Sequence, residues 1–217
     1  MTIRYPNGKL YTPNASVQKT EKKSKNKDLS FSNRGKTLED EINEANDYYI
    51  KRRLAIIHKK PVPVQIVKVE YPSRSAAVIR EAYFRTPSTT DYNGVWNGHY
   101  IDFDAKETAS KTSFPLKNIH EHQMTHMQQV TEQNGVAFII VRFSAFERYF
   151  IVPYKVLQKA WQAMENGNRK SIPFSIIEEE AYEIPTSYYP RIDYLPIIQQ
   201  LIDANATGLK VRRNKND

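Results

Sequence analysis

Hydrophobic and polar positions along the chain change their period several times, and each change predicts a different element. After a polar N-terminal stretch, apolar residues return at helical spacing in "KTLEDEINEANDYYI", where Leu38, Ile42, Ala45 and Tyr49 fall on one face. Thr37 precedes this run as a favourable N-cap, and an acidic residue follows three positions later, as in a relative of the capping box. The pattern therefore predicts an amphipathic helix that begins just after Thr37.

Strand-like runs follow this helix. The segments "LAIIHKK" and "VQIVKVEY" are rich in β-branched residues and are separated by "PVP". By its period, "SAAVIREAYFRT" fits either a helix or a strand. The segment "TTDYNGVWNGHYIDFDAKE" predicts two strands around a turn, with turn chemistry supplied by Gly94 and by Asn97 and Gly98.

The second half of the chain predicts alternating helices and strands. "NIHEHQMTHMQQVTEQNG" is typical of a helix with a core stripe of Met124, Met127 and Val130 and with Gly135 at the C′ position. "VAFIIVRF" is a continuous apolar run typical of a central strand, and "RYFIVPY" is expected to pair beside it. Two helices, in "VLQKAWQAMEN" and "IDYLPIIQQLIDA", complete the pattern, with Pro196 limiting the start of the second. The order of elements predicts a mixed α/β domain.

Composition narrows the classes of protein that fit. The chain has 217 residues, a formal net charge of +8 and no cysteine. A basic surplus favours a polyanionic partner such as nucleic acid, although a basic soluble protein without such a partner has the same balance. The absence of cysteine excludes disulfides and thiolate metal sites and favours a reducing cytoplasm. The N-terminus lacks the apolar stretch of a secretory signal, and no apolar run reaches the length of a membrane span.

Charge and polarity divide the chain into three parts. Residues 1–32 are predicted to be a flexible, disordered basic arm, residues 33–205 the main domain, and residues 206–217 a basic tail. The arm either folds onto phosphates or acts only as a solubilising tail, and the basic body favours the first interpretation. Its candidate DNA-binding residues are Lys22, Lys23, Lys25 and Lys27.

The candidate chemistry lies on one strand-like segment. In "YIDFDAKET", Asp102, Asp104 and Lys106 alternate and therefore share a face, while apolar residues fill the other face. Together with Asp91 on the preceding strand, they match the D-x(n)-(D/E)-x-K pattern of a nuclease superfamily. Two carboxylates on neighbouring strands hold a hard divalent cation, and a nearby lysine stabilises charge on a phosphate. Taken alone, the pattern also fits a solvated strand face.

Longer blocks make the pattern more specific. The segments "NRGKTLED", "AIIHKKPVPVQIVKVEYPSRSAAVIREAYFRTPSTTDYNG", "YIDFDAKETASKTSFPLKNIHEHQ" and "PRIDYL" resemble, in this order, the RecU family of Holliday junction resolvases. The resemblance covers roughly Asn33 to Leu195. It implies a restriction-endonuclease-like α/β core with a mixed sheet, a protruding stalk at about residues 71–86, and a homodimer.

The resemblance also implies roles for individual residues. Thr89 and Asp91 match the metal-binding Thr and Asp of the family, Asp104 its acidic metal ligand, and Gln123 a further metal-site residue. Lys106 matches its catalytic lysine. The cofactor implied is Mg²⁺, with Mn²⁺ as a plausible substitute. The family usually has Glu where this chain has Asp104, and the shorter side chain is expected to alter ligand geometry, metal preference or rate.

Other polar residues have less definite roles. Asp102 is interpreted as supporting the metal ligands from outside or as solvated, and Glu39 on the first helix is placed to approach the site. His122 and His126 have an i, i+4 spacing seen in zinc helices, but "HEHQMTH" is not H-E-x-x-H. They and His120 are expected to face solvent or DNA, or to pack near Gln123.

The predicted stalk carries candidate DNA contacts. Arg74, Arg80 and Arg85 would face the phosphates at the open centre of a four-way junction, and Tyr83 or Phe84 would stack on an unpaired base. The alternative is an ordinary hairpin or helix with solvated arginines and core aromatics.

These features predict a cytoplasmic, homodimeric, Mg²⁺-dependent endonuclease that resolves Holliday junctions by symmetric nicking of like strands. The expected partners are four-way junction DNA and, from the family, recombinase and branch-migration proteins, with no role at a membrane. A non-catalytic junction-binding or recombinase-modulating protein, its nuclease site weakened by Asp104, is the alternative. A sequence-specific restriction enzyme on the same fold is a third interpretation, for which the sequence offers no base-reading element.

Overall fold

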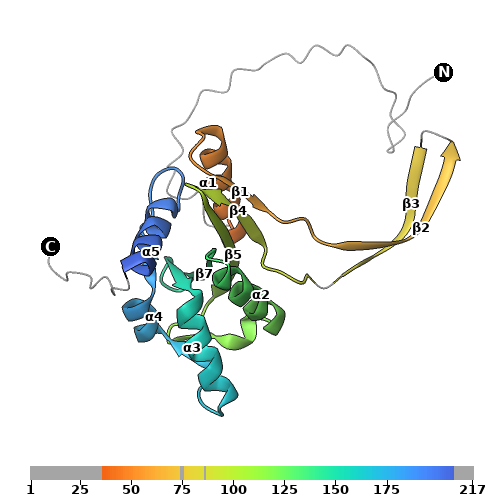
Figure 1. Cartoon of the computed structure of the whole chain (residues 1–217). Helices are drawn as coiled ribbons and strands as arrows, with labels where there is room; N and C mark the ends of the chain where they lie inside the picture. The colour runs from red at the N-terminus through yellow and green to blue at the C-terminus, as the bar shows by residue number, and fades with distance from the viewer. Residues whose placement is uncertain (1–35, 74–75, 86, 208–217) are drawn as a thin grey trace, which may run out of the picture. The chain divides into compact units, whose positions relative to one another are not determined.

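The computed structural model describes residues 36–73, 76–85 and 87–207. The predicted arm 1–32 and most of the predicted tail 206–217 lie outside the described residues. The candidate DNA-binding residues that also lie outside them are Lys22, Lys23, Lys25, Lys27 and Arg74. The described part has the predicted mixed α/β architecture (Figure 1).

Helices and strands alternate along the described chain. The helices are α1 (Leu38–Lys51), the short 3-10 helix η2 (Leu116–Asn118), α2 (Glu121–Glu132), α3 (Tyr154–Glu165), α4 (Phe174–Glu180) and α5 (Leu195–Thr207). The strands are β1 (Ile56–Lys59), β2 (Val64–Ser73), β3 (Ala76–Phe84), β4 (Tyr92–Trp96), β5 (His99–Thr108), β6 (Ser113–Pro115), β7 (Val136–Phe143), β8 (Arg148–Pro153), β9 (Ser171–Pro173) and β10 (Tyr182–Ile184). The helices and main strands that the sequence predicts are all present, and the short elements β6, β9, β10 and α4 were not predicted.

A six-stranded sheet organises the domain, in the order β1-β4-β5-β7-β8-β10. The β5–β7 pair is parallel and the other pairs are antiparallel. A parallel pair needs a crossover connection, which here contains α2. Every residue of β7 is buried, and β8 pairs beside it, which confirms the predicted central strand and its neighbour.

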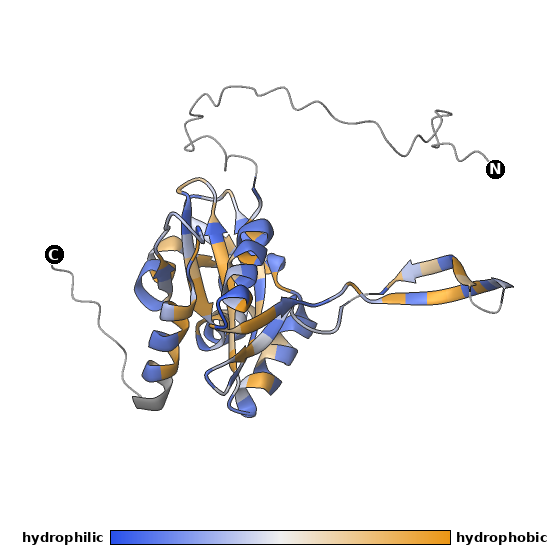
Figure 2. Cartoon of the chain, turned by 90° about the horizontal axis from the view of Figure 1, so that it is seen from above, coloured by the Kyte–Doolittle hydropathy of each residue, from blue (hydrophilic) through white to orange (hydrophobic). Residues whose placement is uncertain are grey.

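Alternate residues of the central strands supply two separate cores, one on each face of the sheet. On one face, Ile101, Phe103 and Phe138 pack with residues of α1 and α5. On the other, Ile139 and Val141 pack with residues of α2, α3 and α4. Figure 2 shows the central strands mainly in the hydrophobic colour, as expected for strands covered on both faces. The predicted core positions of α1 are confirmed: Leu38, Ile42, Ala45 and Tyr49 are all buried.

Three aromatic rings cross the middle of the sheet. Tyr92 on β4 stacks on Phe103 of β5, with ring centroids 4.9 Å apart, and Phe103 stacks on Phe138 of β7 at the same separation. Each pair is also a registered cross-strand pair. Because a one-residue slip would move these rings to the opposite face, their burial holds the register of the three strands.

The start of α1 has the capping chemistry that the sequence indicates. The Asp40 backbone nitrogen donates to the Thr37 hydroxyl at 3.2 Å, and the Thr37 backbone nitrogen donates to the Asp40 carboxylate at 3.1 Å. The buried Arg142 of β7 donates to the Lys36 carbonyl at 3.0 Å. The helix start is therefore tied to the central strand next to the candidate site.

Turn chemistry matches the prediction at one place and differs at two. Asn97 and Gly98 adopt positive φ angles of 48° and 80° and join β4 to β5, as predicted. Gly94 lies inside β4, where a Cβ atom would stand 2.0 Å from the Ile56 carbonyl oxygen. After α2, the left-handed residue is Asn134, with φ of 61°, so the placement of Gly135 at C′ was wrong. Gly135 is instead required by close packing against the last turn of α2.

The β2–β3 hairpin is a separate two-stranded sheet. The segment whose period left helix and strand open is the strand β3. The hairpin begins at Val64, well before the predicted stalk region 71–86, and most of its residues are exposed. Apolar colour persists on its strands in Figure 2 although they pair with no other described strand. Among the described residues, no helix has the length and apolar character needed to cross a membrane.

We expect Gly94→Ala to destabilise the domain more than Gly98→Ala. The first change forces β1 away from β4, because the added Cβ meets backbone atoms, and overpacking of this kind costs about 1–3 kcal/mol. The second meets open space and costs only the strain of its positive φ, about 1 kcal/mol. Urea unfolding of both variants would measure the difference. Equal losses, or a larger loss in Gly98→Ala, would contradict the close approach of β1.

Candidate active site

Two carboxylates meet across the β4–β5 pair. The ladder between these strands pairs Tyr92 with Phe103 and Asn93 with Asp102. Asp91 directly precedes β4, so it occupies the position across from Asp104 on the same face of the sheet. The predicted acidic pair is thus brought together by strand register, although the two residues are far apart in sequence.

Burial makes this pair electrostatically costly. Asp104 is 0% exposed. Burial raises the pKa of its carboxyl to about 6; the Lys106 charge opposes this rise, and the Asp91 charge adds to it. A carboxylate whose pKa is raised by a second carboxylate at the same site is typical of a cation-binding or catalytic position.

Lys106 and Gln123 approach Asp104 from two directions. The Lys106 Nζ atom forms an ion pair with the buried Asp104 Oδ1 atom at 3.0 Å. The Gln123 amide nitrogen donates to Asp104 Oδ2, while the Gln123 Oε1 atom accepts from the His120 backbone nitrogen at 3.1 Å. Gln123 therefore presents its nitrogen to the carboxylate, and its side chain must turn before its oxygen can bind a cation.

The donor set fits a hard divalent cation. Asp91 and Asp104 supply carboxylate oxygens, and the buried Asp104 Oδ1 atom lies 3.0 Å from the Lys106 ammonium group. No three His, Asp or Glu side chains within the described ranges converge closely enough to form a metal site alone. Two carboxylates completed by water and phosphate oxygens are the arrangement that Mg²⁺ favours in phosphate chemistry.

Two further predicted residues, Thr89 and Glu39, contact other groups in the described structure. Thr89 is half-buried, and its hydroxyl donates to the Thr90 carbonyl at 3.2 Å. Glu39 on α1 forms a 2.5 Å ion pair with Lys59. Burial, followed by the charges of Glu39, Asp91 and Asp104, raises the pKa of the Tyr92 hydroxyl. The acid on α1 therefore acts on the same tyrosine as the acidic pair.

Of the two alternatives for Asp102, the solvated one is wrong. Its side chain is 0% exposed and has four partners in the described part of the chain, which the sequence analysis did not identify. The partners are Lys60, Thr90, Tyr100 and His126. Lys60 lies where the chain enters the hairpin and Thr90 where it leaves. This position in the sequence was the one feature that could have indicated their contact with Asp102.

The histidines of α2 have separate roles. His126 contacts Asp102, with its Nε2 atom 3.1 Å from Oδ2. His120 and His122 stack on each other with ring centroids 5.4 Å apart. Burial lowers the pKa of His122, and the charges of His120 and Lys106 lower it further. His122 therefore lies near Lys106.

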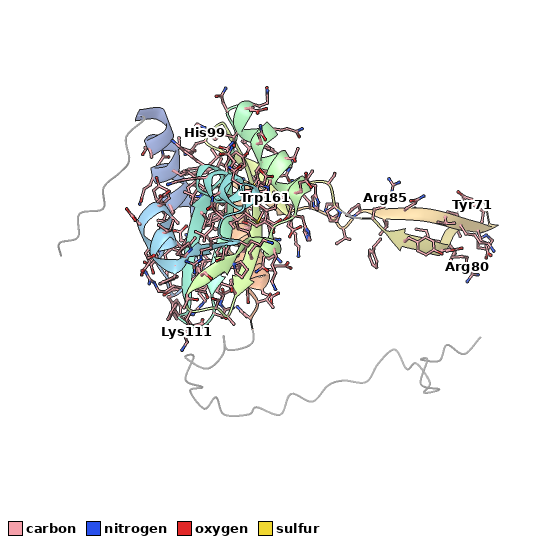
Figure 3. The ribbon with its side chains drawn as sticks, turned by 90° about the horizontal axis from the view of Figure 1, so that it is seen from below. Tyr71, Arg80, Arg85, His99, Lys111 and Trp161 are labelled. Atoms are coloured by element: carbon pink, nitrogen blue, oxygen red, sulfur yellow. The ribbon has the colours of Figure 1, made fainter. Side chains whose placement is uncertain are left out.

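The hairpin carries the other candidate DNA contacts. Arg80 pairs with Glu70 at 2.7 Å, and the Arg85 Nε atom donates to the Gln65 amide oxygen at 3.2 Å. Figure 3 shows both arginine side chains pointing away from the hairpin strands. Tyr83 and Phe84 are 60% and 83% exposed, so they are not core aromatics. This exposure removes one part of the alternative interpretation of the stalk.

Comparison with known proteins shows the family of the chain. The sequence model of the family described as Recombination protein U matches residues 33–200. The chain belongs to the RecU family. The match includes both strands of the acidic pair, Lys106, Gln123 and the whole hairpin.

Curated members of the RecU family are similar over nearly the whole chain. The Holliday junction resolvase RecU of Bacillus subtilis (strain 168) is 53% identical over 208 residues, which are 96% of this chain and 99% of that protein. The protein of the same name from Bacillus cereus (strain B4264) is 51% identical, covering 93% of this chain and 98% of its own length. That from Staphylococcus epidermidis is 49% identical over 92% and 96%, respectively.

We expect Asp104→Asn to stabilise the metal-free protein at neutral pH. The folded-state pKa of about 6 exceeds the ordinary value of 3.8, so the folded protein favours the neutral carboxyl. Ionisation of Asp104 therefore destabilises the fold. The full stability is present below pH 3.8, where the carboxyl is neutral in both states, and stability falls as the pH rises through 6. Since Asn mimics the neutral acid, the gain should be about 3 kcal/mol at pH 7 and about half of that at pH 5.

Urea unfolding in EDTA at the two pH values would measure this gain. Asp47→Asn is the matched control, because Asp47 is an exposed acid on α1 and its replacement should change stability by no more than about 0.5 kcal/mol. A less stable Asp104→Asn protein at pH 7 would contradict a strained acidic pair.

Proposed function

We propose that the chain is a Holliday junction resolvase, an endonuclease that selects four-way junctions by their structure and nicks like strands symmetrically during recombination and DNA repair. The observation that carries the proposal is the buried Asp104 opposite Asp91, with the Lys106 amine 3.0 Å from the Asp104 carboxylate, in a member of the RecU family. The names of the curated relatives support the same activity.

The acidic pair would hold Mg²⁺, with Mn²⁺ as a substitute. Asp91 and Asp104 provide carboxylate oxygens, with Thr89 and, after its side chain turns, Gln123 as further ligands. When bound, the cation neutralises charge on the scissile phosphate and activates water. The raised pKa of Asp104 means that the site binds a cation less well below about pH 6, where protons compete for the carboxylate.

Lys106 would contribute a positive charge of its own. Its side chain is 17% exposed and is held beside Asp104 on β5, so little conformational freedom is lost when a phosphate arrives. A fixed ammonium group stabilises negative charge as it develops on the phosphate and on the leaving oxygen. Asp104 would thus contact both the cation and the Lys106 amine, which would bring the two positive charges to the same phosphate.

The hairpin would give selectivity for the junction. Arg80 and Arg85 are exposed cations, and Tyr83 and Phe84 offer exposed rings to unpaired bases. Arg80 must exchange Glu70 for a phosphate, so binding should depend on salt concentration. Contacts of this kind recognise shape and backbone rather than base sequence.

Two active sites related by a two-fold axis would suit a substrate with two like strands. We therefore propose that the chain acts as a homodimer. From the family resemblance, we further propose a cytoplasmic location and contacts with recombinase and branch-migration proteins.

A nicking assay would test the proposal. Labelled four-way junction and matched linear duplex are incubated with Mg²⁺, Mn²⁺ or EDTA and with wild type or Asp91→Asn. We expect symmetric, metal-dependent nicks in the junction only, and a rate at least about 100-fold lower in Asp91→Asn because one carboxylate of the site is lost. Junction binding should persist in the variant.

Two outcomes would overturn the proposal. Tight junction binding without nicks under either metal, with activity that appears only in Asp104→Glu, would favour the non-catalytic junction-binding alternative. Cutting of the linear duplex at one site would favour a restriction enzyme on the same fold.

A further inference from the structure

Asp102 is a buried carboxylate that the proposed chemistry does not use. Both of its oxygens are occupied: Oδ1 accepts from the Thr90 hydroxyl, and Oδ2 lies 2.9 Å from Lys60 Nζ, 3.0 Å from the Tyr100 hydroxyl and 3.1 Å from His126 Nε2. By contrast, Oδ1 of the nearby Asp104 lies 3.0 Å from a single ammonium group, that of Lys106. Asp102 is therefore saturated by protein groups and is unsuited to binding a metal.

Two of these partners come from the two legs of the hairpin. The first leg, residues 60–63, leaves β1 at Lys60, and the second leg, residues 87–91, returns through Thr90 to Asp91. The Lys60 amine also donates to the Thr90 hydroxyl at 3.1 Å. One buried carboxylate thus binds the entry and the exit of the hairpin at the same point.

The legs are also joined through their backbones. The Lys60 backbone nitrogen donates to the Asp91 carbonyl at 2.7 Å, and the Arg85 backbone nitrogen donates to the Pro63 carbonyl at 2.9 Å. The hairpin strands themselves pair with no other described strand. If the hairpin moves when it binds DNA, the movement is therefore transmitted to the six-stranded sheet through these legs.

Burial of the Asp102 charge favours a clamp over an incidental contact. A fully buried carboxylate is stable only when it is paired and hydrogen-bonded. Separating the first leg removes the Lys60 ammonium from Oδ2, and separating the second leg removes the Thr90 hydroxyl from Oδ1. The legs are consequently held in one arrangement. Since Thr90 directly precedes Asp91, that arrangement also decides where the Asp91 carboxylate stands relative to Asp104.

We propose that Asp102 is a positioning residue that clamps both legs of the hairpin and so couples engagement of DNA by the hairpin to the placement of Asp91. The functional half of this inference rests on the proposed resolvase activity. The structural half, a clamp at the base of the hairpin, concerns the metal-free protein and is tested without any reaction.

Hydrogen exchange measured by mass spectrometry on the full chain in EDTA tests the clamp. Lys60→Met and Thr90→Val each remove one tie, while Lys60→Arg and Thr90→Ser keep it. Lys159→Met is the matched control, because Lys159 pairs with Glu180 on the surface, away from Asp102. We expect the Lys60 and Arg85 amides, whose hydrogen bonds to Asp91 and Pro63 close the base of the hairpin, to exchange about tenfold faster in Lys60→Met and Thr90→Val. The reason is the loss of a hydrogen bond to a charged group from a locally opening segment.

The conservative variants and the control should exchange like wild type, and peptides from β7 should be unchanged in all variants. Equal acceleration throughout the domain would show a general packing role and overturn the clamp. Unchanged amide exchange at the base of the hairpin in both Lys60→Met and Thr90→Val would overturn the clamp as well.

Single-turnover cleavage of a prebound junction tests the coupling. In Lys60→Met and Thr90→Val we expect a cleavage rate about tenfold lower, with junction affinity within about twofold of wild type, because the hairpin remains but Asp91 is misplaced. Rescue in Thr90→Ser is expected. Faster leg exchange with an unchanged cleavage rate would overturn the coupling, whereas absence of cleavage in wild type would overturn the proposed function and leave the exchange result to decide the clamp.

Discussion

The register between β4 and β5 is the constraint on which the candidate site depends. The stacked rings of Tyr92, Phe103 and Phe138 fill one face of these strands, and their burial excludes a slipped pairing. On the opposite face, the same register sets Asp91 across from Asp104 and leaves Lys106 one step further along. The hydrophobic core thus fixes the spacing of the polar groups, and the site requires no cluster of acids close together in sequence.

The cost of this arrangement falls on Asp104. A buried carboxylate beside another carboxylate destabilises the metal-free fold, and the surrounding core offsets that cost. The hairpin has a related cost, since Tyr83, Phe84 and several β-branched residues are exposed to water and no third described strand pairs with β2 and β3. A bound cation would neutralise the Asp104 charge, and nucleic acid would cover the exposed rings, so ligand binding would offset both costs. The proposed function therefore explains two unfavourable features together.

The sequence predicted much of the fold because its strongest signals are local. The face of α1, the all-apolar β7 and the Asn97-Gly98 turn follow from periodicity and turn chemistry, and the structure agrees. The proximity of Asp91, Asp104 and Lys106 followed from strand alternation together with the family resemblance. The end of α2 was predicted wrongly, because both Asn134 and Gly135 suit the left-handed position that ends a helix. The sequence alone does not separate these two residues.

The role of Asp102 could not be predicted, because it depends on distant groups. Alternation places Asp102 on the polar face, but only the fold brings Lys60, Thr90 and His126 around it and removes it from water. The orientation of the Gln123 amide has the same origin, since the His120 backbone competes for its oxygen.

The central claim is that Asp91 and Asp104 bind one cation between them, and an anomalous difference map from crystals soaked in Mn²⁺ tests it most directly. The account predicts a peak within coordinating distance of both carboxylates and none at Asp102, whereas a peak at Asp102, or none between Asp91 and Asp104, would contradict it.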